Sequence, residues 1–186
     1  MERKTPLYQT HVDAGGKIVE FGGFLMPVQY PTGVLAEHMA VRQKAGLFDV
    51  SHMAVAELIE REGRGGARDI DGDIKYAMFC NDAGGILDDF IVYRCAADDY
   101  WLVVNAGNRD KDAAWVESHL FGDVDYRDEG DDWGQVALQG PKSGDILKKL
   151  CAEQYIPAKY YTFIDNIPLN LGSRTIHALV SQTGYT

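Results

Sequence analysis

The sequence has little positive charge and no long apolar run. Its 186 residues contain 18 Lys and Arg against 28 Asp and Glu, a formal net charge of −10. An acidic chain is poorly suited to nucleic acid as its main partner, because phosphate contacts need positive surface. No apolar run approaches the roughly 20 residues that cross a bilayer, so no membrane partner is expected. The opening residues lack the apolar stretch of a signal peptide.

Cysteine is also scarce, with only Cys80, Cys95 and Cys151. Their number is odd, they form no Cys-x-x-Cys pair, and the five histidines are scattered. We therefore expect no metal site. The three thiols are expected to be small buried apolar groups in a reducing compartment, the cytoplasm. Both common glycine-rich phosphate-binding patterns are missing.

The residues that are present indicate an α+β fold. Hydrophobic residues make up 46% and charged residues 25% of the chain, which is ordinary globular composition. Three runs at 75–80, 86–94 and 100–105, joined by short polar turns, predict an antiparallel meander, and a helix is expected over 108–120. Helices and strands do not alternate as regular βαβ units. Residues 61–73 are glycine-rich and charged, and we expect a mobile loop there.

The strand predicted over 86–94 carries two adjacent carboxylates, Asp88 and Asp89. Alternate residues of a strand share a face, and both faces of this strand are otherwise apolar, so at least one carboxylate must point into a mostly buried surface. A desolvated carboxylate is costly and is often found where an acid, a base or a ligand contact is needed. The other interpretation is that one Asp caps the preceding turn and the other reaches solvent. The spacing alone leaves both open.

Aromatic and amide side chains fall on three successive strands of the meander, at Tyr76, Tyr93 and Asn105. Together they can line one side of a flat heteroaromatic ligand, with rings for stacking and an amide for paired hydrogen bonds. They can equally be core tyrosines with hydroxyls at the rim. Earlier in the chain, His52 is interpreted as a structural hydrogen-bonding residue, and Met53 as an adaptable contact to a ring.

Several ordered segments resemble one known family. They are Phe21 to Tyr30, Leu47-Phe48-Asp49-Val50-Ser51-His52-Met53, Cys80 to Tyr93, Val103-Val104-Asn105-Ala106, Gln139-Gly140-Pro141-Lys142 and Thr183-Gly184-Tyr185-Thr186. Together they resemble the N-terminal part of the T-protein of the glycine cleavage system, a family of aminomethyltransferases that bind tetrahydrofolate. The resemblance covers nearly the whole chain except 61–73.

The resemblance implies an activity and partners. A T-protein takes the aminomethyl group carried on the lipoyl arm of the H-protein and transfers its carbon to tetrahydrofolate, with release of ammonia. The matching carboxylate is Asp89, which is expected to hydrogen-bond the pterin and to assist proton movement as the folate nitrogen attacks. The residues expected to line the folate pocket are Met53, Tyr76, Tyr93, Asn105, Tyr160 and Tyr185.

The resemblance also implies a domain plan. A discontinuous first domain is expected from 1–53 plus 132–186, around a middle domain over 54–131 that contains the meander. The third, C-terminal β domain of the family is expected to be absent, as in a truncated form. Residues 61–73 are shorter than the family's usual segment, and Gln182 stands where Arg is common. Two alternatives remain open: a non-catalytic folate-binding module, and another folate-dependent demethylase of the same superfamily.

Overall fold

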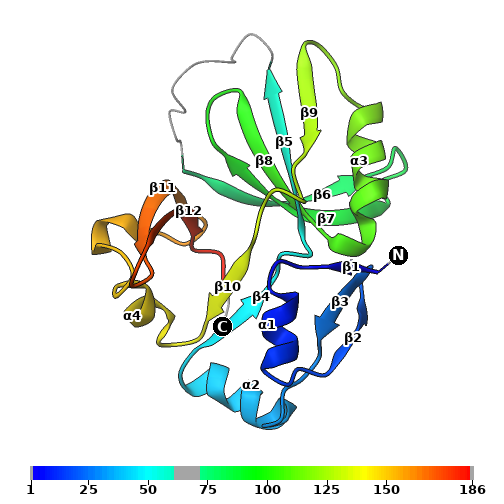
Figure 1. Ribbon diagram of the computed structural model, residues 1–186. Coiled ribbons are helices and arrows are strands. Elements are labelled where there is room, and N and C mark those ends of the chain that lie inside the picture. The colour runs from blue at the N-terminus through cyan, green and yellow to red at the C-terminus, as the bar shows by residue number, and fades with distance from the viewer. Residues whose placement is uncertain (1, 61–71, 185–186) are drawn as a thin grey trace. The chain divides into compact units, whose positions relative to one another are not determined.

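The computed structural model (Figure 1) describes residues 2–60 and 72–184, and within them no helix has the length and apolar character needed to cross a membrane. These residues combine helices with mainly antiparallel strands, which confirms the α+β expectation. The chain divides into two compact units. Unit 1 comprises Met1–His52, Gly134–Leu150 and Gly184–Thr186, and unit 2 comprises Met53–Trp133 and Cys151–Thr183.

Unit 1 is built from short elements around two small sheets. In chain order they are β1 (Arg3–Lys4), α1 (Tyr8–Asp13), β2 (Ile18–Phe21), β3 (Phe24–Pro27), α2 (Val34–Gln43), β4 (Gly46–Asp49), β10 (Val136–Gln139) and α4 (Ser143–Leu147). One sheet has the order β1-β3-β2, and the other pairs β4 with β10.

A buried histidine connects the elements of unit 1. His11 on α1 is 8% exposed, and its ring nitrogens lie 2.7 Å from the Tyr30 hydroxyl and 2.9 Å from a carboxylate oxygen of Asp49. His52 packs edge-on against the rings of Phe21 and Phe24. Its role here is packing, because its buried Nδ1 has no hydrogen-bond partner among the described residues, in contrast to the hydrogen-bonding role expected from the sequence. Both histidines are therefore used within unit 1 to join its strands and helix.

Unit 2 contains the larger sheet. Its elements are β5 (Ala54–Glu60), β6 (Ile74–Cys80), β7 (Ile86–Arg94), β8 (Asp99–Val104), the 3-10 turn η2 (Ala106–Asn108), α3 (Arg109–Ser118), β9 (Val124–Asp128), the 3-10 turn η3 (Glu153–Tyr155), β11 (Phe163–Asn170) and β12 (Thr175–Ser181). Strands β6, β7 and β8 are the predicted meander, and the sheet order is β6-β7-β8-β5-β9. A separate hairpin pairs β11 with β12.

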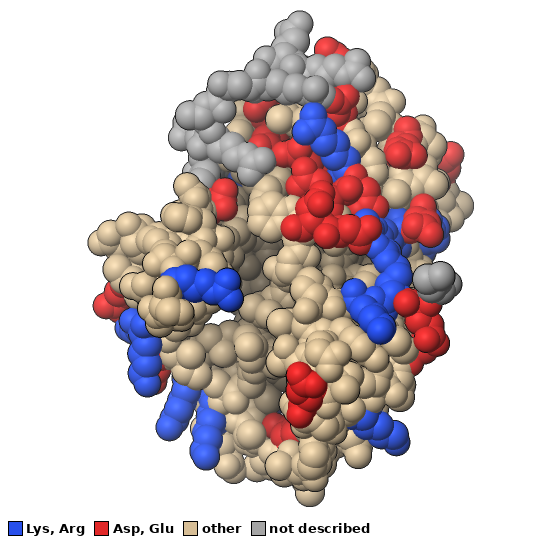
Figure 2. Space-filling view, in the orientation of Figure 1, with Lys and Arg blue, Asp and Glu red and all other residues tan. Residues whose placement is uncertain are grey.

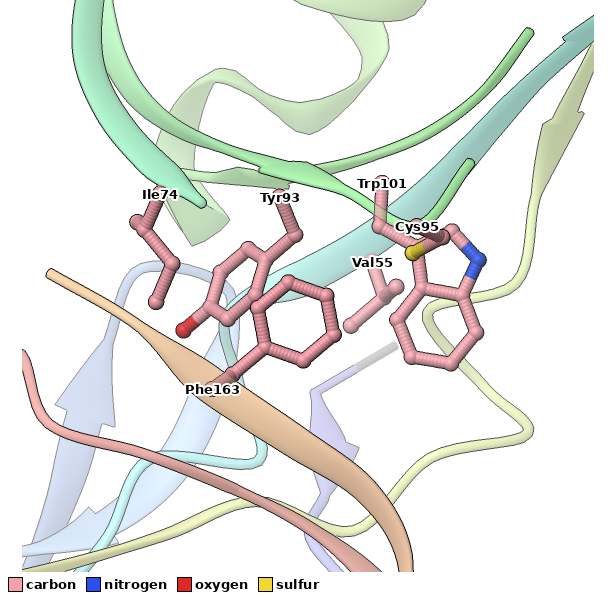
Figure 3. Close-up of a cluster of buried hydrophobic side chains, with 6 residues drawn as sticks. All are labelled: Val55, Ile74, Tyr93, Cys95, Trp101 and Phe163. Atoms are coloured by element: carbon pink, nitrogen blue, oxygen red, sulfur yellow. The ribbon is translucent and has the colours of Figure 1, made fainter. Parts of the chain in front are cut away.

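Each face of the five-stranded sheet buries its own apolar cluster. On one face, Leu102 and Val104 of β8 pack with Val116 of α3. On the other face, Trp101 of β8 packs with Phe163 of β11. Figure 3 shows this second cluster, which also includes Val55, Ile74, Tyr93 and Cys95. The inner strands β5 and β8 are covered on both faces, which explains why they read as nearly continuous apolar runs.

One irregularity sets the register of the β6–β7 hairpin. Phe79 pairs with Asp88, whereas the next residue, Cys80, pairs with Ile86. Leu87 is therefore the extra residue of a β-bulge, opposite no residue of β6. Beyond the bulge the pairing is regular, and Met78 lies directly opposite Asp89.

Some segments differ from what the sequence patterns indicate. The expected first domain covers 1–53 plus 132–186, whereas the compact unit 2 includes Cys151–Thr183, with Phe163, 3% exposed, in its core. Strand β3 was not predicted. Of the three cysteines only Cys95 is buried, while Cys80 is exposed on a strand at the edge of the sheet.

The loop predicted over 61–73 lies outside the described residues except at its end. Gly72 is buried, and its carbonyl accepts a hydrogen bond from the Phe163 amide at 3.1 Å. Asp73 forms a β-bridge with Thr162. These last two residues are therefore paired with the segment that leads into β11.

The core position of Phe163 gives a stability prediction. Phe163→Ala should lower the free energy of unfolding by about 3–5 kcal/mol, because it leaves a cavity among buried aromatic rings. Urea denaturation measures the change. Phe121→Ala is the matched control, since Phe121 is 87% exposed, and it should change stability by no more than about 0.5 kcal/mol. Equal effects of the two substitutions would contradict the packing of β11 against the sheet.

Candidate functional site

The Asp89 carboxylate is held from both neighbouring strands. The hydroxyl of Tyr76 on β6 donates a hydrogen bond to Asp89 Oδ2. The side-chain amide of Asn105, the residue that follows β8, lies 3.3 Å from Asp89 Oδ1 and 3.0 Å from the Asp89 carbonyl oxygen. Asp89 itself is partly exposed. The sheet therefore presents one carboxylate, in a fixed orientation, to a region that solvent can reach.

Exposed apolar groups surround this carboxylate on β6. Met78 lies opposite Asp89 and is 51% exposed, and Tyr76 is 57% exposed. Opposed residues of antiparallel strands share a face, so the thioether, the phenol ring and the carboxylate are side by side. A polarisable thioether and an aromatic ring next to an oriented carboxylate suit a flat ligand that carries N–H donors.

Tyr93 lies on the same face of β7 but belongs to the core. Its side chain is 8% exposed, and its ring meets that of Phe163 with centroids 5.3 Å apart. In Figure 3 its hydroxyl points away from Trp101, and it lies 3.1 Å from the hydroxyl of Ser181 on β12. Burial raises the pKa of Tyr93, so the phenol stays protonated.

The other sequence-predicted site residues are placed differently. The Tyr160 hydroxyl donates to the Thr183 carbonyl at 3.2 Å, and its ring packs edge-on against Tyr161. Met53 is half-buried just before β5. Tyr185 lies outside the described residues. The hydrogen bonds thus join Asp89, Tyr76 and Asn105 directly, while Tyr160 bonds to the segment after β12.

Asp88 points to the opposite face of the sheet, toward α3. It is 8% exposed, is hydrogen-bonded to Asp112 of α3, and accepts a hydrogen bond from the Asn105 amide at 3.1 Å. The Asp89 backbone amide and the Asn108 side chain also donate to it. Burial by itself raises the pKa of Asp88, but these hydrogen bonds outweigh it and leave the pKa below its ordinary value. The desolvated carboxylate expected from the strand pattern is therefore Asp88, and the accessible one is Asp89.

Asp112 is the more strongly perturbed member of this pair. It is 2% exposed. Burial, together with its hydrogen bond to Asp88 and the negative charge of Asp88, raises the pKa of Asp112 from 3.8 to about 7. Lys111, 3.9 Å away, lowers that pKa only partly. Asp112 therefore keeps a proton at a pH where an ordinary aspartate is ionised.

The family model described as GCVT N-terminal domain matches residues 7–186. The chain belongs to this family.

Curated relatives and a solved structure agree with this assignment. The chain is 41% identical to an aminomethyltransferase of Desulfitobacterium hafniense and 39% identical to one of Halalkalibacterium halodurans; each match covers 99% of this chain and 52% of the relative. A crystal structure of glycine cleavage system aminomethyltransferase T from Bartonella henselae superposes with a TM-score of 0.77 at 32% identity, over 89% of this chain and 48% of that one. The chain thus spans about half the length of these relatives.

In this GCVT N-terminal domain, ion pairs fix the helix that carries Asp112. Figure 2 shows acidic side chains gathered on one part of the visible face, with Lys and Arg beside them. Arg109, at the start of α3, donates to both carboxylate oxygens of Asp128 at 2.7 Å and to Asp131 at 3.0 Å. A two-pronged Arg–carboxylate bond is geometrically specific. It ties α3 to the end of β9 and so fixes the place of Asp112.

Three residues near the site were missed from the sequence. Asp112 lies four positions before Val116 and therefore shares its buried helix face, a spacing that could have revealed it. Met78 could be placed beside Asp89 only from the register of the β6–β7 hairpin, which the sequence does not reveal. Tyr161 has a φ of 60°, in the left-handed region that non-glycine residues rarely adopt, and it raises the pKa of both Tyr76 and Tyr93. No local sequence pattern marks that backbone conformation.

In the part of the chain that the structure describes, no three His, Cys, Asp or Glu side chains are grouped so as to hold a metal ion.

The Tyr76 phenol is suited to hydrogen bonding. Its hydrogen bond to Asp89 raises the pKa of Tyr76, so it remains a donor. The residues around Asp89 therefore supply a negative charge, a phenol and an amide.

The raised pKa of Asp112 gives a pH prediction. Since the folded chain binds this proton more tightly than the unfolded chain, the stability gained is full below about pH 3.8 and is lost as the pH rises through about 7. Asp112→Asn cannot ionise and should not show this loss. The two proteins should therefore diverge with increasing pH, by at most ~4 kcal/mol, since one pKa unit is worth about 1.4 kcal/mol.

Urea denaturation at a series of pH values measures the difference. The control is Asp110→Asn, an exposed position two residues earlier on α3, which should follow the native pH dependence. If the Asp112→Asn curve ran parallel to the native curve across this range, Asp112 would not be the protonated group.

Proposed function

We propose that this chain forms the tetrahydrofolate-binding part of an aminomethyltransferase of the glycine cleavage system. The observation that carries the proposal is the accessible Asp89 carboxylate, held by Tyr76 and Asn105 beside the exposed Met78. Its relatives named aminomethyltransferase and the matching T-protein structure support the reaction class. Tetrahydrofolate is the acceptor substrate, and the donor is an aminomethyl group on the lipoyl arm of the H-protein.

The residues fit a reduced pterin. Such a ring system is flat and carries N–H groups along one edge, and a carboxylate that accepts from N–H donors is the natural partner for that edge. Tyr76 and Met78 offer a ring and a thioether to the flat face. Met53, Tyr93, Tyr160 and Tyr185 complete the proposed pocket by resemblance to the family.

The proposed chemical role of Asp89 is to accept a proton from the attacking folate nitrogen. Transfer of the aminomethyl carbon joins it to two folate nitrogens and breaks its bonds to the lipoyl sulfur and to the amino nitrogen. The two protons lost by the folate nitrogens leave on the lipoyl thiol and on ammonia, so each nitrogen must give up a proton as its new bond forms. A carboxylate within hydrogen-bonding reach can hold the pterin in register and accept this proton. Tyr76 and Asn105 donate to Asp89 and so keep its oxygens oriented. Asp89 is thus the proposed catalytic residue.

The partners and location follow from the same proposal. The lipoylated H-protein is the expected protein partner. A cytoplasmic location is part of the proposal and is supported by three free thiols, one of them exposed on β6, as is usual in a reducing compartment.

The proposal predicts that Asp89 is needed for turnover more than for binding. In a protein that carries this chain with the further length of its relatives, Asp89→Asn should lower turnover by about 10²-fold or more, the range of general acid–base catalysis. Tetrahydrofolate should still bind, because the amide keeps an acceptor oxygen. Turnover is followed with aminomethyl-loaded H-protein, and binding by isothermal titration calorimetry under anaerobic conditions.

Asp82→Asn is the matched control, since Asp82 is an exposed aspartate in the turn of the same hairpin. It should leave both measurements unchanged. Equal turnover of Asp89→Asn and the native protein would defeat the catalytic role. Binding without turnover in the native protein would favour the folate-binding module instead.

A further inference from the structure

The carboxyl groups of Asp88 and Asp112 form a buried pair behind the Asp89 site. Asp88 projects from β7 and Asp112 from α3, and the two are 8% and 2% exposed. They are hydrogen-bonded to each other. Two carboxyl oxygens can share a hydrogen bond only when one of them carries a proton. The pair is therefore one acid and one carboxylate.

Besides Asn105, the Asp89 backbone amide and the Asn108 side chain donate to the Asp88 carboxylate. Among the described residues, neither oxygen of Asp112 nor Oδ2 of Asp88 has a hydrogen bond from an N–H or O–H group, apart from the proton that the pair shares. Lys111 is 49% exposed at its side chain and donates instead to the Leu87 carbonyl at 2.7 Å. A buried carboxylate oxygen without a donor is costly. A proton shared between Asp88 and Asp112 gives these oxygens the hydrogen bond that they otherwise lack.

Asn105 links this pair to Asp89. Its single amide nitrogen lies 3.1 Å from Asp88 Oδ1, 3.0 Å from the Asp89 carbonyl oxygen and 3.3 Å from Asp89 Oδ1. An amide nitrogen carries two protons, so it can serve the Asp88 side and the Asp89 side at once. A change in the position or protonation of Asp88 therefore alters the hydrogen bonding of Asn105, the residue that orients Asp89.

We propose that Asp112 is a positioning residue: its proton fixes Asp88 as the acceptor for Asn105, and Asn105 in turn orients the Asp89 carboxylate. This role rests on the proposed function of Asp89. Asp112 touches no part of the expected substrate and acts only through Asp88 and Asn105.

Loss of the shared proton should weaken the hydrogen bonds that connect Asp112, through Asp88 and Asn105, to Asp89. The charged and titratable groups that face Asp112 are Asp88 and Asp89 from β7, Lys111 on its own helix and Tyr126 from β9. Ionisation of Asp112 removes a donor from Asp88 and places a second negative charge beside it, with only the partly exposed Lys111 to offset it. Asn105 then loses a fixed acceptor on one side.

The first experiment needs no folate. The native chain is labelled with ¹⁵N, and the side-chain amide signals of Asn105, assigned from their loss in Asn105→Ser, are followed with pH. They should shift with a midpoint near pH 7, where Asp112 loses its proton. In Asp112→Asn, whose amide replaces the proton donor at every pH, this shift should vanish. A pH-independent Asn105 signal in the native chain, or an unchanged shift in Asp112→Asn, would overturn the proposal.

The second experiment separates positioning from packing. In the longer protein, Asp112→Ala should lower kcat about tenfold with little change in KM for tetrahydrofolate, because small misplacement of a reacting group costs rate rather than binding. Asp112→Asn should restore kcat and remove its pH dependence near neutrality. A kcat of Asp112→Ala equal to the native value, or no rescue by Asp112→Asn, would contradict the role.

The two proposals fail in different ways. If Asp89→Asn keeps full turnover, the catalytic role of Asp89 is lost, while the Asn105 titration still decides whether Asp112 controls that amide. If Asp89→Asn is inactive but the Asn105 signals ignore Asp112, the positioning role alone is wrong.

Discussion

The site depends on the way a β-strand distributes two neighbouring carboxyl groups. Successive side chains of a strand point to opposite faces, so Asp88 and Asp89 of β7 cannot share an environment. The face toward α3 is closed, and a carboxylate there needs a proton or a donor. The other face, between Tyr76 and Asn105, admits solvent. Two identical side chains thereby acquire different chemistry from a single backbone property.

Asn105 matters because it stands where the two environments meet. It follows the last residue of β8 and reaches both the Asp88 side chain and the Asp89 backbone. A hydroxyl carries one proton and could serve only one of these acceptors, whereas the amide carries two. The helix α3 begins a few residues later and brings Asp112 onto Asp88, with Arg109 bound to Asp128 holding the helix start. Residues 105–112 thus supply both the amide that links Asp88 to Asp89 and the helix start that holds Asp112 against Asp88.

Much of unit 2 could be predicted from the sequence, because local patterns determine it. The three runs of the meander are separated by polar turns, and their pairing follows from their order along the chain. The identity of the buried carboxylate was not predictable, because it depends on the side of the sheet that α3 covers. The packing of 151–183 with unit 2 could not be read from the sequence for a similar reason, because it comes from contacts of Phe163 with residues that are distant in sequence. Strand β3 is short and ends in proline, so it carries only a weak signal.

The β-bulge at Leu87 has a consequence for how this hairpin can change over evolutionary time. Leu87 is opposite no residue of β6, so its deletion would close the bulge and leave Asp88 opposite Phe79 and Asp89 opposite Met78. Deletion of a paired residue of β7 between Leu87 and Asp89 would instead shift the register by one and turn the remaining side chains to the other face. Loss of Leu87 should therefore be tolerated far better than loss of its paired neighbour.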